Sequence, residues 1–131
     1  MGSKDKPTAG KIVCVTSEGS DLEANVDPRF GRCQYFIIVD TATLDFEVVQ
    51  NPNISGMGGV GVQSAQLMVD KDVSAVLTGN VGPNAFQTLK AAGIEMITGV
   101  TGVVKDAVEK YKEGGFKSIS EPTVEHKSGM E

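Results

Sequence analysis

The sequence predicts an α/β fold in which a mixed five-stranded sheet lies between helices, with elements in the order β-β-β-α-β-α-β-α. The chain has 131 residues, which suits one domain with one core. Five short runs are rich in Val and Ile, as is typical of strands. In the second half these runs alternate with segments of helical periodicity, which indicates parallel strands joined by crossovers.

Three strands are predicted in the first half. Residues 11–17 form a short apolar run rich in β-branched residues, which indicates a strand buried on both faces. Strands are also predicted over 35–40 and 46–50, and the short link between them suits a hairpin. A long polar loop over 18–32 separates the first two strands, and a turn-rich loop over 51–58 follows the third.

The second half predicts helices over 60–71, 83–92 and 101–112, and buried strands over 73–78 and 94–97. Pro at the start of the second helix suits a first turn, and Gly residues follow the last two helices. Apolar side chains recur at helical spacing at Ala65 and Met68, at Phe86 and Leu89, and at Val104, Ala107, Val108 and Tyr111.

This topology predicts where the loops meet. Right-handed crossovers make the first, fourth and fifth strands parallel, and the hairpin returns the third strand to the same direction. The loops after these four strands, and the starts of all three helices, then lie at one end of the sheet. Helix N-termini favour anions, and open α/β sheets bind ligands at this end. The sequence therefore predicts a site for a small anionic ligand there.

The residues of these loops agree with an anion site. Two loops are rich in Gly, which permits close approach of the backbone, although tight turns alone would explain either loop by itself. Guanidinium groups suit oxyanions, and both arginines of the chain lie in the first loop. The residues concerned are Gly58, Gly59, Gly79, Gly82, Arg29 and Arg32.

Several short motifs occur together: Arg-Phe-Gly-Arg-Cys at 29–33 before Tyr-Phe at 35–36, Asn-Pro at 51–52, Gly-Gly-Val-Gly at 58–61, and Gly-Pro-Asn-Ala-Phe at 82–86. In this combination the chain resembles the dinitrogenase iron–molybdenum cofactor biosynthesis family over residues 11–119. That family includes accessory and carrier proteins of nitrogenase cofactor assembly, as well as many small stand-alone proteins.

The resemblance implies a ribonuclease-H-like arrangement and a non-catalytic carrier, scaffold or storage protein. Its ligand would be an anionic metal–sulfur cluster, such as the iron–molybdenum cofactor or a precursor, exchanged with cluster-assembly or acceptor proteins. Members often place a His where this chain has Arg29, and the only His here is His126, which argues against a His-anchored cofactor. The expected cofactor-binding residues are Arg29, Phe30, Gly31, Arg32, Cys33, Gly58, Gly59, Gly79, Gly82 and Asn84.

Cys33 is the candidate metal ligand, because Arg29 and Arg32 could favour its thiolate. The alternative is a small apolar residue that opens the second strand. Cys14 lies mid-strand, where a structural role is expected, and two cysteines make no closed zinc site. Asn84 could donate to a ligand or could stabilise the first turn of its helix.

Other function classes fit less well. A ribonuclease-H-like nuclease needs clustered carboxylates on its central strands, and residues 11–17 contain none. Because the only His lies in the tail, the expected domain has no Ser-His-Asp or Cys-His pair, and we expect no enzymatic activity. A phosphate- or nucleotide-binding sensor is the alternative, although no aromatic set for base stacking lies near the glycines.

Charge and composition limit partners and location. A net charge of −5 gives no basic footprint for nucleic acid, and no apolar run is long enough to span a membrane. The first ten residues lack the apolar stretch of a signal peptide, and two cysteines suggest reduced thiols in the cytoplasm. Residues 1–10 and 120–131 are expected to be disordered tails around one cofactor-binding domain, 11–119.

Overall fold

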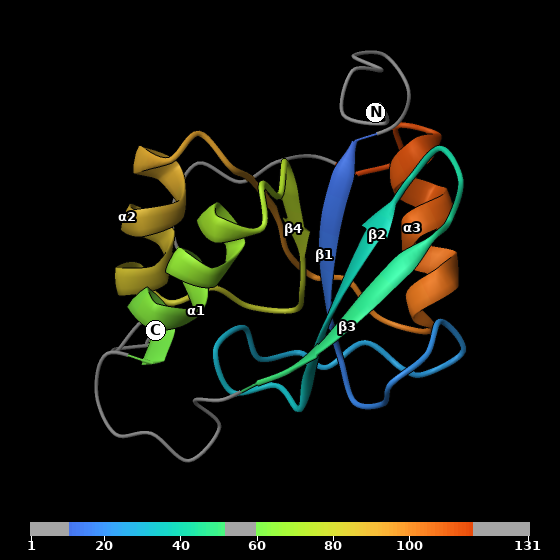
Figure 1. Ribbon diagram of the computed structural model, residues 1–131, viewed down its shortest axis with the longest axis horizontal. Helices are drawn as coiled ribbons and strands as arrows, with labels where there is room; N and C mark the ends of the chain where they lie inside the picture. The colour runs from blue at the N-terminus through green and yellow to red at the C-terminus, as the bar shows by residue number, and fades with distance from the viewer. Residues whose placement is uncertain (1–10, 52–59, 117–131) are drawn as a thin grey trace.

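The computed structural model describes residues 11–51 and 60–116, which form one five-stranded mixed sheet and three helices (Figure 1). The strands are β1 (Ile12–Ser17), β2 (Tyr35–Asp40), β3 (Phe46–Gln50), β4 (Ala75–Leu77) and β5 (Glu95–Ile97), and the helices are α1 (Val60–Asp70), α2 (Pro83–Ala91) and α3 (Val104–Lys112). The predicted fold class and element order are confirmed. None of the helices in these described ranges is both long and apolar enough to cross a membrane.

The strand order is β3-β2-β1-β4-β5, with β1 at the centre. Strand β1 is antiparallel to β2 and parallel to β4, so that Cys14 lies between Ile38 and Val76. Strand β3 is antiparallel to β2, and β5 is parallel to β4. The carboxyl ends of β1, β3, β4 and β5 therefore share one end of the sheet, as the sequence predicted.

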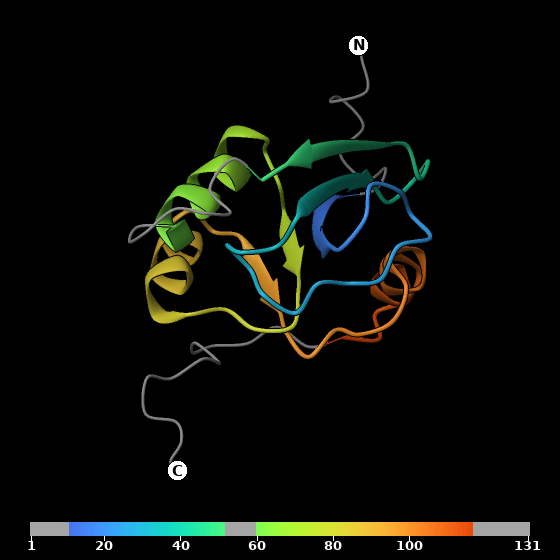
Figure 2. The ribbon, with the colours of Figure 1, turned by 90° about the horizontal axis from the view of Figure 1, so that it is seen from below.

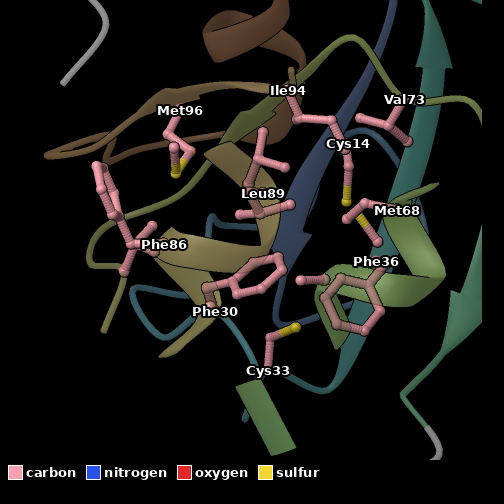
Figure 3. Close-up of a cluster of buried hydrophobic side chains, with 14 of the residues drawn as sticks. Cys14, Phe30, Cys33, Phe36, Met68, Val73, Phe86, Leu89, Ile94 and Met96 are labelled. Atoms are coloured by element: carbon pink, nitrogen blue, oxygen red, sulfur yellow. The ribbon is translucent and has the colours of Figure 1, made fainter. Parts of the chain in front are cut away.

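The sheet is the middle of three layers. Helices α1 and α2 lie on one face and α3 lies on the other (Figures 1 and 2). Alternate side chains of β1 enter the two cores. Cys14 packs with residues of α1 and α2 (Figure 3). Val13 and Val15 pack with residues of α3. Strand β1 is thus buried on both faces, which its uninterrupted apolar run predicted.

Helix α3 begins at Val104, three residues later than predicted. Gly102 has a φ of +91°, and Val103 is extended with φ −87° and ψ 140°, so neither residue can continue a helix. The predicted start at residue 101 is therefore wrong, because backbone conformation rather than apolar spacing sets this boundary.

The segment over 18–32 is less of a solvated loop than its composition suggested. Val26, Asp27 and Phe30 are buried within it. The N–H of Val26 donates to the carbonyl of Gly102 at 2.8 Å, and the N–H of Asp27 donates to the carbonyl of Thr16 at 2.9 Å. The segment consequently crosses the carboxyl end of the sheet (Figure 2).

Two buried serines give a matched test of the core. Ser64 on α1 is buried, and its Oγ has no hydrogen-bond partner among the described residues. Ser17 is also buried, but its Oγ donates to the carbonyl of Gly19 at 2.7 Å and accepts from the N–H of Gly19 at 3.1 Å.

We expect Ser64→Ala to raise the free energy of unfolding by about 1 kcal/mol, because it removes an unsatisfied buried hydroxyl. Ser17→Ala should lower the free energy of unfolding by about 1 kcal/mol, because it breaks satisfied hydrogen bonds. Urea denaturation of both variants measures the difference. Equal losses in the two variants would contradict the interpretation of Ser64.

Candidate functional site

Two buried threonines fasten the 18–32 segment to the sheet. Thr16 lies on β1, and Thr78 directly follows β4. Thr16 Oγ1 lies 2.6 Å from the carbonyl oxygen of Asp27 and 2.8 Å from Thr78 Oγ1. The backbone of Asp27 is thereby held over the point where the parallel strand β4 meets β1, which is where open α/β sheets form their ligand crevice.

The chain itself fills this crevice. A Cβ atom on Gly79 would lie 2.6 Å from Pro28 Cα, so only glycine permits this approach of two backbones. The carbonyl of Asn80 accepts from the N–H of Phe30 at 3.3 Å, and Arg29 and Asn80 form an isolated parallel bridge. Gly79 thus makes room for Pro28. A ligand at this end of the sheet must therefore lie outside the filled crevice, on the outer rim around Arg29 and the start of α2.

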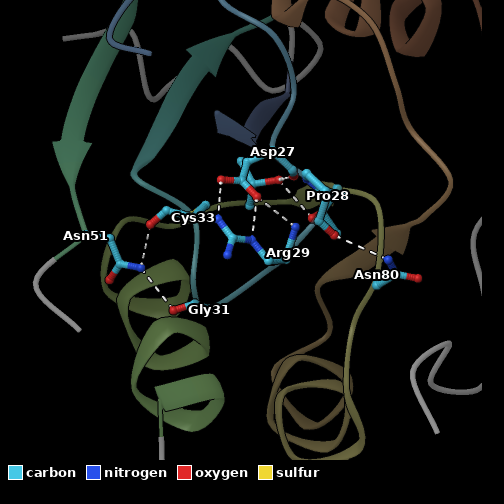
Figure 4. A network of polar contacts seen from close by, with 9 residues as sticks. Asp27, Pro28, Arg29, Gly31, Cys33, Asn51 and Asn80 are labelled. Carbon is cyan, nitrogen blue, oxygen red and sulfur yellow. Dashed lines mark hydrogen bonds and ion pairs between the residues drawn. The ribbon is translucent and has the colours of Figure 1, made fainter. Parts of the chain in front are cut away.

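Asp27 and Arg29 form an ion pair on that rim (Figure 4). Asp27 Oδ1 accepts from the backbone N–H of Arg29 at 3.0 Å and from its Nε at 3.1 Å, and Oδ2 accepts from Nη2 at 3.2 Å. The Asp27 side chain is 1% exposed, whereas the Arg29 side chain is 61% exposed. The hydrogen bonds and charge of Asp27 raise the pKa of Arg29 further, so the guanidinium stays charged.

Asn51 organises the rest of the Arg-Phe-Gly-Arg-Cys motif. It is buried, and its Nδ2 donates to the carbonyls of Gly31 at 3.0 Å and Cys33 at 2.9 Å (Figure 4). Gly31 has a φ of +96°, a conformation that favours glycine. Asn51 belongs to the Asn-Pro motif at 51–52, but it was not among the residues predicted for the site.

The motif turns its side chains in two directions. Arg29 and Arg32 are exposed. Phe30 is buried against Phe36, with ring centroids 5.8 Å apart, and Cys33 is fully buried in the same core (Figure 3). The motif thus leaves both arginines exposed to solvent and buries Phe30 and Cys33 in the core. Direct ligand contact by these two buried residues stays a prediction that requires the segment to move.

Burial governs the chemistry of Cys33. Loss of solvent, and then the charge of Asp27, raise the pKa of Cys33 from 9.0 to about 12. Hydrogen bonds from the backbone N–H groups of Cys33 and Ser17, and the charge of Arg29, oppose this rise only in part. The charge of Arg29 thus favours the thiolate, as expected, but burial outweighs it and the thiol of Cys33 stays protonated. Burial also raises the pKa of Cys14 well above its ordinary value, as suits the structural role expected for it.

The start of α2 lies at the same end of the sheet. Gly82 is the N-cap residue, Pro83 stands in the first turn, and the described residues supply no side-chain cap to this turn. Asn84 is exposed in the same turn, and its two expected roles, contact with a ligand or support of this turn, stay predictions. A Cβ atom on Gly82 would meet no described residue within 4 Å. Such a start offers free N–H groups to an anion.

Some predicted features lie elsewhere. Gly58 and Gly59 fall outside the described residues. Among residues 11–51 and 60–116, no group of three or more His, Cys, Asp or Glu side chains gathers as a metal site would require. A hollow of about 490 Å³ lies at the opposite end of the sheet, and none of the predicted site residues lines it. Its lining includes Lys11, Thr41, Glu95, Tyr111, Lys112 and Phe116.

Comparisons with known proteins agree with this architecture. A model of the family described as dinitrogenase iron-molybdenum cofactor matches residues 11–114. An uncharacterized protein of Methanocaldococcus jannaschii is 33% identical over 97 residues, which is 72% of this chain and 82% of that protein.

Two solved structures are also similar. The apo form of the orange protein from Desulfovibrio gigas is 38% identical with a TM-score of 0.84, and the match covers 88% of this chain and 98% of that one. A Thermotoga protein described as a candidate NifB protein of the DUF35 family is 39% identical with a TM-score of 0.76, with the same coverage of 88% and 98%.

Two glycines of the site give opposite predictions. Gly79→Ala should lower the free energy of unfolding by about 1–3 kcal/mol, because the new Cβ overlaps Pro28. Gly82→Ala should change it by no more than about 0.5 kcal/mol, because the position is open. Urea denaturation compares the two variants. A stable Gly79→Ala protein would contradict the close packing of the two segments.

The buried thiol of Cys33 predicts a loss of stability at alkaline pH. The raised pKa keeps this thiol protonated in the folded chain at pH values where the unfolded chain has released the proton. Its contribution is complete below pH 9.0 and declines as pH rises from 9.0 toward about 12. Between pH 9.0 and about 12, the free energy of unfolding of the wild type should therefore fall more steeply than that of Cys33→Ala, by about 1 kcal/mol for each pH unit. Urea titrations at several alkaline pH values provide the measurement, and parallel curves would contradict it.

Proposed function

Because the chain belongs to the dinitrogenase iron-molybdenum cofactor family, we propose that it binds and carries an anionic metal–sulfur cluster without catalysing a reaction. The observation that carries this proposal is the outer rim at the carboxyl end of the sheet. There the exposed Arg29 pairs with Asn80, which comes two residues before the N-cap of α2, and the exposed Arg32 follows in the same motif. The proposed role is cofactor assembly or storage, with other proteins that supply and receive the cluster.

The donors on this rim suit a bulky anion. A guanidinium is planar and weakly hydrated, so it contacts a large anion through its N–H groups and its face. The start of α2 adds backbone N–H groups and the positive end of the helix dipole. The exposed Asn84 side chain can donate from the same turn. Holding the cluster by such contacts requires no proton transfer and no covalent step by the protein.

Ligation by Cys33 is a finer part of the proposal. The thiol is buried with a pKa of about 12, so a bond to metal requires the segment to open and the thiol to lose its proton. A coordinating metal ion can drive that deprotonation. The arginines would then capture the anion first, and Cys33 would bind metal afterwards.

Anaerobic loading with an iron–molybdenum–sulfur cluster tests the proposal, with visible absorbance and metal content after gel filtration as the readouts. The wild type should retain the cluster. Arg29→Gln combined with Arg32→Gln should weaken retention by about tenfold or more, because each charged hydrogen bond contributes about 1.5–3 kcal/mol. Lys112→Gln, at the opposite end of the sheet, removes one charge as a control and should change nothing.

The outcomes separate the candidate functions. Unchanged retention in the double arginine variant would mean that the proposed site is wrong. A colourless wild type that carries a phosphate-containing ligand by mass spectrometry would replace the carrier with the phosphate or nucleotide sensor. Loss of metal in Cys33→Ser, but not in Cys14→Ser, would support ligation by Cys33, and equal retention in both would exclude it.

A further inference from the structure

Asp27 holds Arg29, one of the two candidate anion-binding arginines. The carboxylate of Asp27 takes both the Nε and the Nη2 donors of Arg29, at 3.1 and 3.2 Å. The same carboxylate also accepts the backbone N–H of Arg29 at 3.0 Å. These contacts occupy the side-on pair of donors that a carboxylate or phosphate otherwise uses for a bidentate contact.

Asp27 is itself fixed to the sheet before any ligand arrives. Its carbonyl lies 2.6 Å from Thr16 Oγ1, and its N–H donates to the carbonyl of Thr16 at 2.9 Å. Its side chain is 1% exposed. The orientation of the Arg29 guanidinium is therefore set by the centre of the fold, although most of that side chain is in solvent.

The same contact sets the negative charge of Asp27 against the positive charge of Arg29. The segment over 18–32 carries four carboxylates and two guanidinium groups, so its own net charge is negative. Glu18 also lies near enough to stabilise the charged form of Arg29. An anion therefore meets fixed N–H donors, with a weak net attraction.

We propose that Asp27 is a positioning residue that makes this site prefer large sulfur-containing anions to compact oxyanions of the same charge. A compact oxyanion is strongly hydrated, so its binding needs net positive charge to offset the loss of water. A thio-anion spreads its charge over larger atoms, and it can rest on the remaining Nη1 group and the guanidinium face. This inference rests on the proposed function and adds the basis of its selectivity.

Tetrathiomolybdate and molybdate form a suitable pair of probes. Both are tetrahedral dianions, and they differ only in whether sulfur or oxygen atoms surround the molybdenum. Their dissociation constants are measured anaerobically for the wild type, Asp27→Asn and Asp21→Asn. The wild type should prefer the thio-anion, and Asp27→Asn should reduce that preference by about tenfold through tighter binding of molybdate. Asp21→Asn removes the same charge from an exposed position in the same segment, and should leave the preference unchanged.

A preference that is unchanged in Asp27→Asn would overturn the proposal. An equal change in Asp21→Asn would also overturn it, because overall charge would then suffice. If Asp27→Asn does not fold, Arg29→Lys replaces it as the test variant. Lysine keeps the positive charge but lacks the planar guanidinium with its fixed N–H donors. The preference of Arg29→Lys for tetrathiomolybdate over molybdate should fall as well. A preference equal to that of the wild type would contradict the role of the fixed guanidinium.

A further readout separates this inference from the proposed function. The Nε–H of Arg29 should give a slowly exchanging NMR signal in the wild type that exchanges faster in Asp27→Asn, because a neutral amide oxygen is a weaker acceptor than a carboxylate. If the wild type binds neither probe, the proposed function fails. The positioning role then stands if Asp27→Asn quickens this exchange and gains molybdate binding, and it falls if the exchange rate is unchanged.

Discussion

The attachment of the 26–30 segment to the ends of β1 and β4 is the contact on which the rest of this end of the molecule depends. Thr16 fixes the backbone of Asp27, and Gly79 lets Pro28 lie against the next loop. A doubly wound sheet normally leaves a crevice at this place, and here the chain closes it. The closure moves the candidate site outward, where Arg29 and the start of α2 share a rim.

The fold could be predicted in detail because its signals are local. The uninterrupted apolar run of β1 indicated burial on both faces, and the alternation of strands with helices fixed the parallel half of the sheet. The start of α3 was missed because it depends on the backbone conformation of Gly102 and Val103. Apolar periodicity carries no information on that conformation, which tertiary contacts select.

The candidate site was predictable in its location and less so in its chemistry. Topology placed Arg29 and Gly82 at one end of the sheet without knowledge of any side-chain position. Whether Cys33 is a thiolate depends on a competition between burial and nearby charge, and burial prevails in the structure. Two apolar residues within a polar loop, Val26 and Phe30, were the available signal that this segment enters the core. Spacing along the chain could not show that Asn51 binds the motif.

A carrier, the role proposed for this chain, must release its ligand as well as hold it, and the pairing of Arg29 with Asp27 would serve both needs. A free arginine at a helix start would attract many anions through charge alone, including abundant phosphate. The buried carboxylate limits that attraction and keeps the donors in fixed directions. Because the orientation of the Arg29 guanidinium is set before binding, little side-chain entropy is lost when the anion arrives. The size and shape of the anion can then decide whether it is held. An exposed rim then leaves the bound anion accessible to an acceptor, whereas a closed crevice would enclose it.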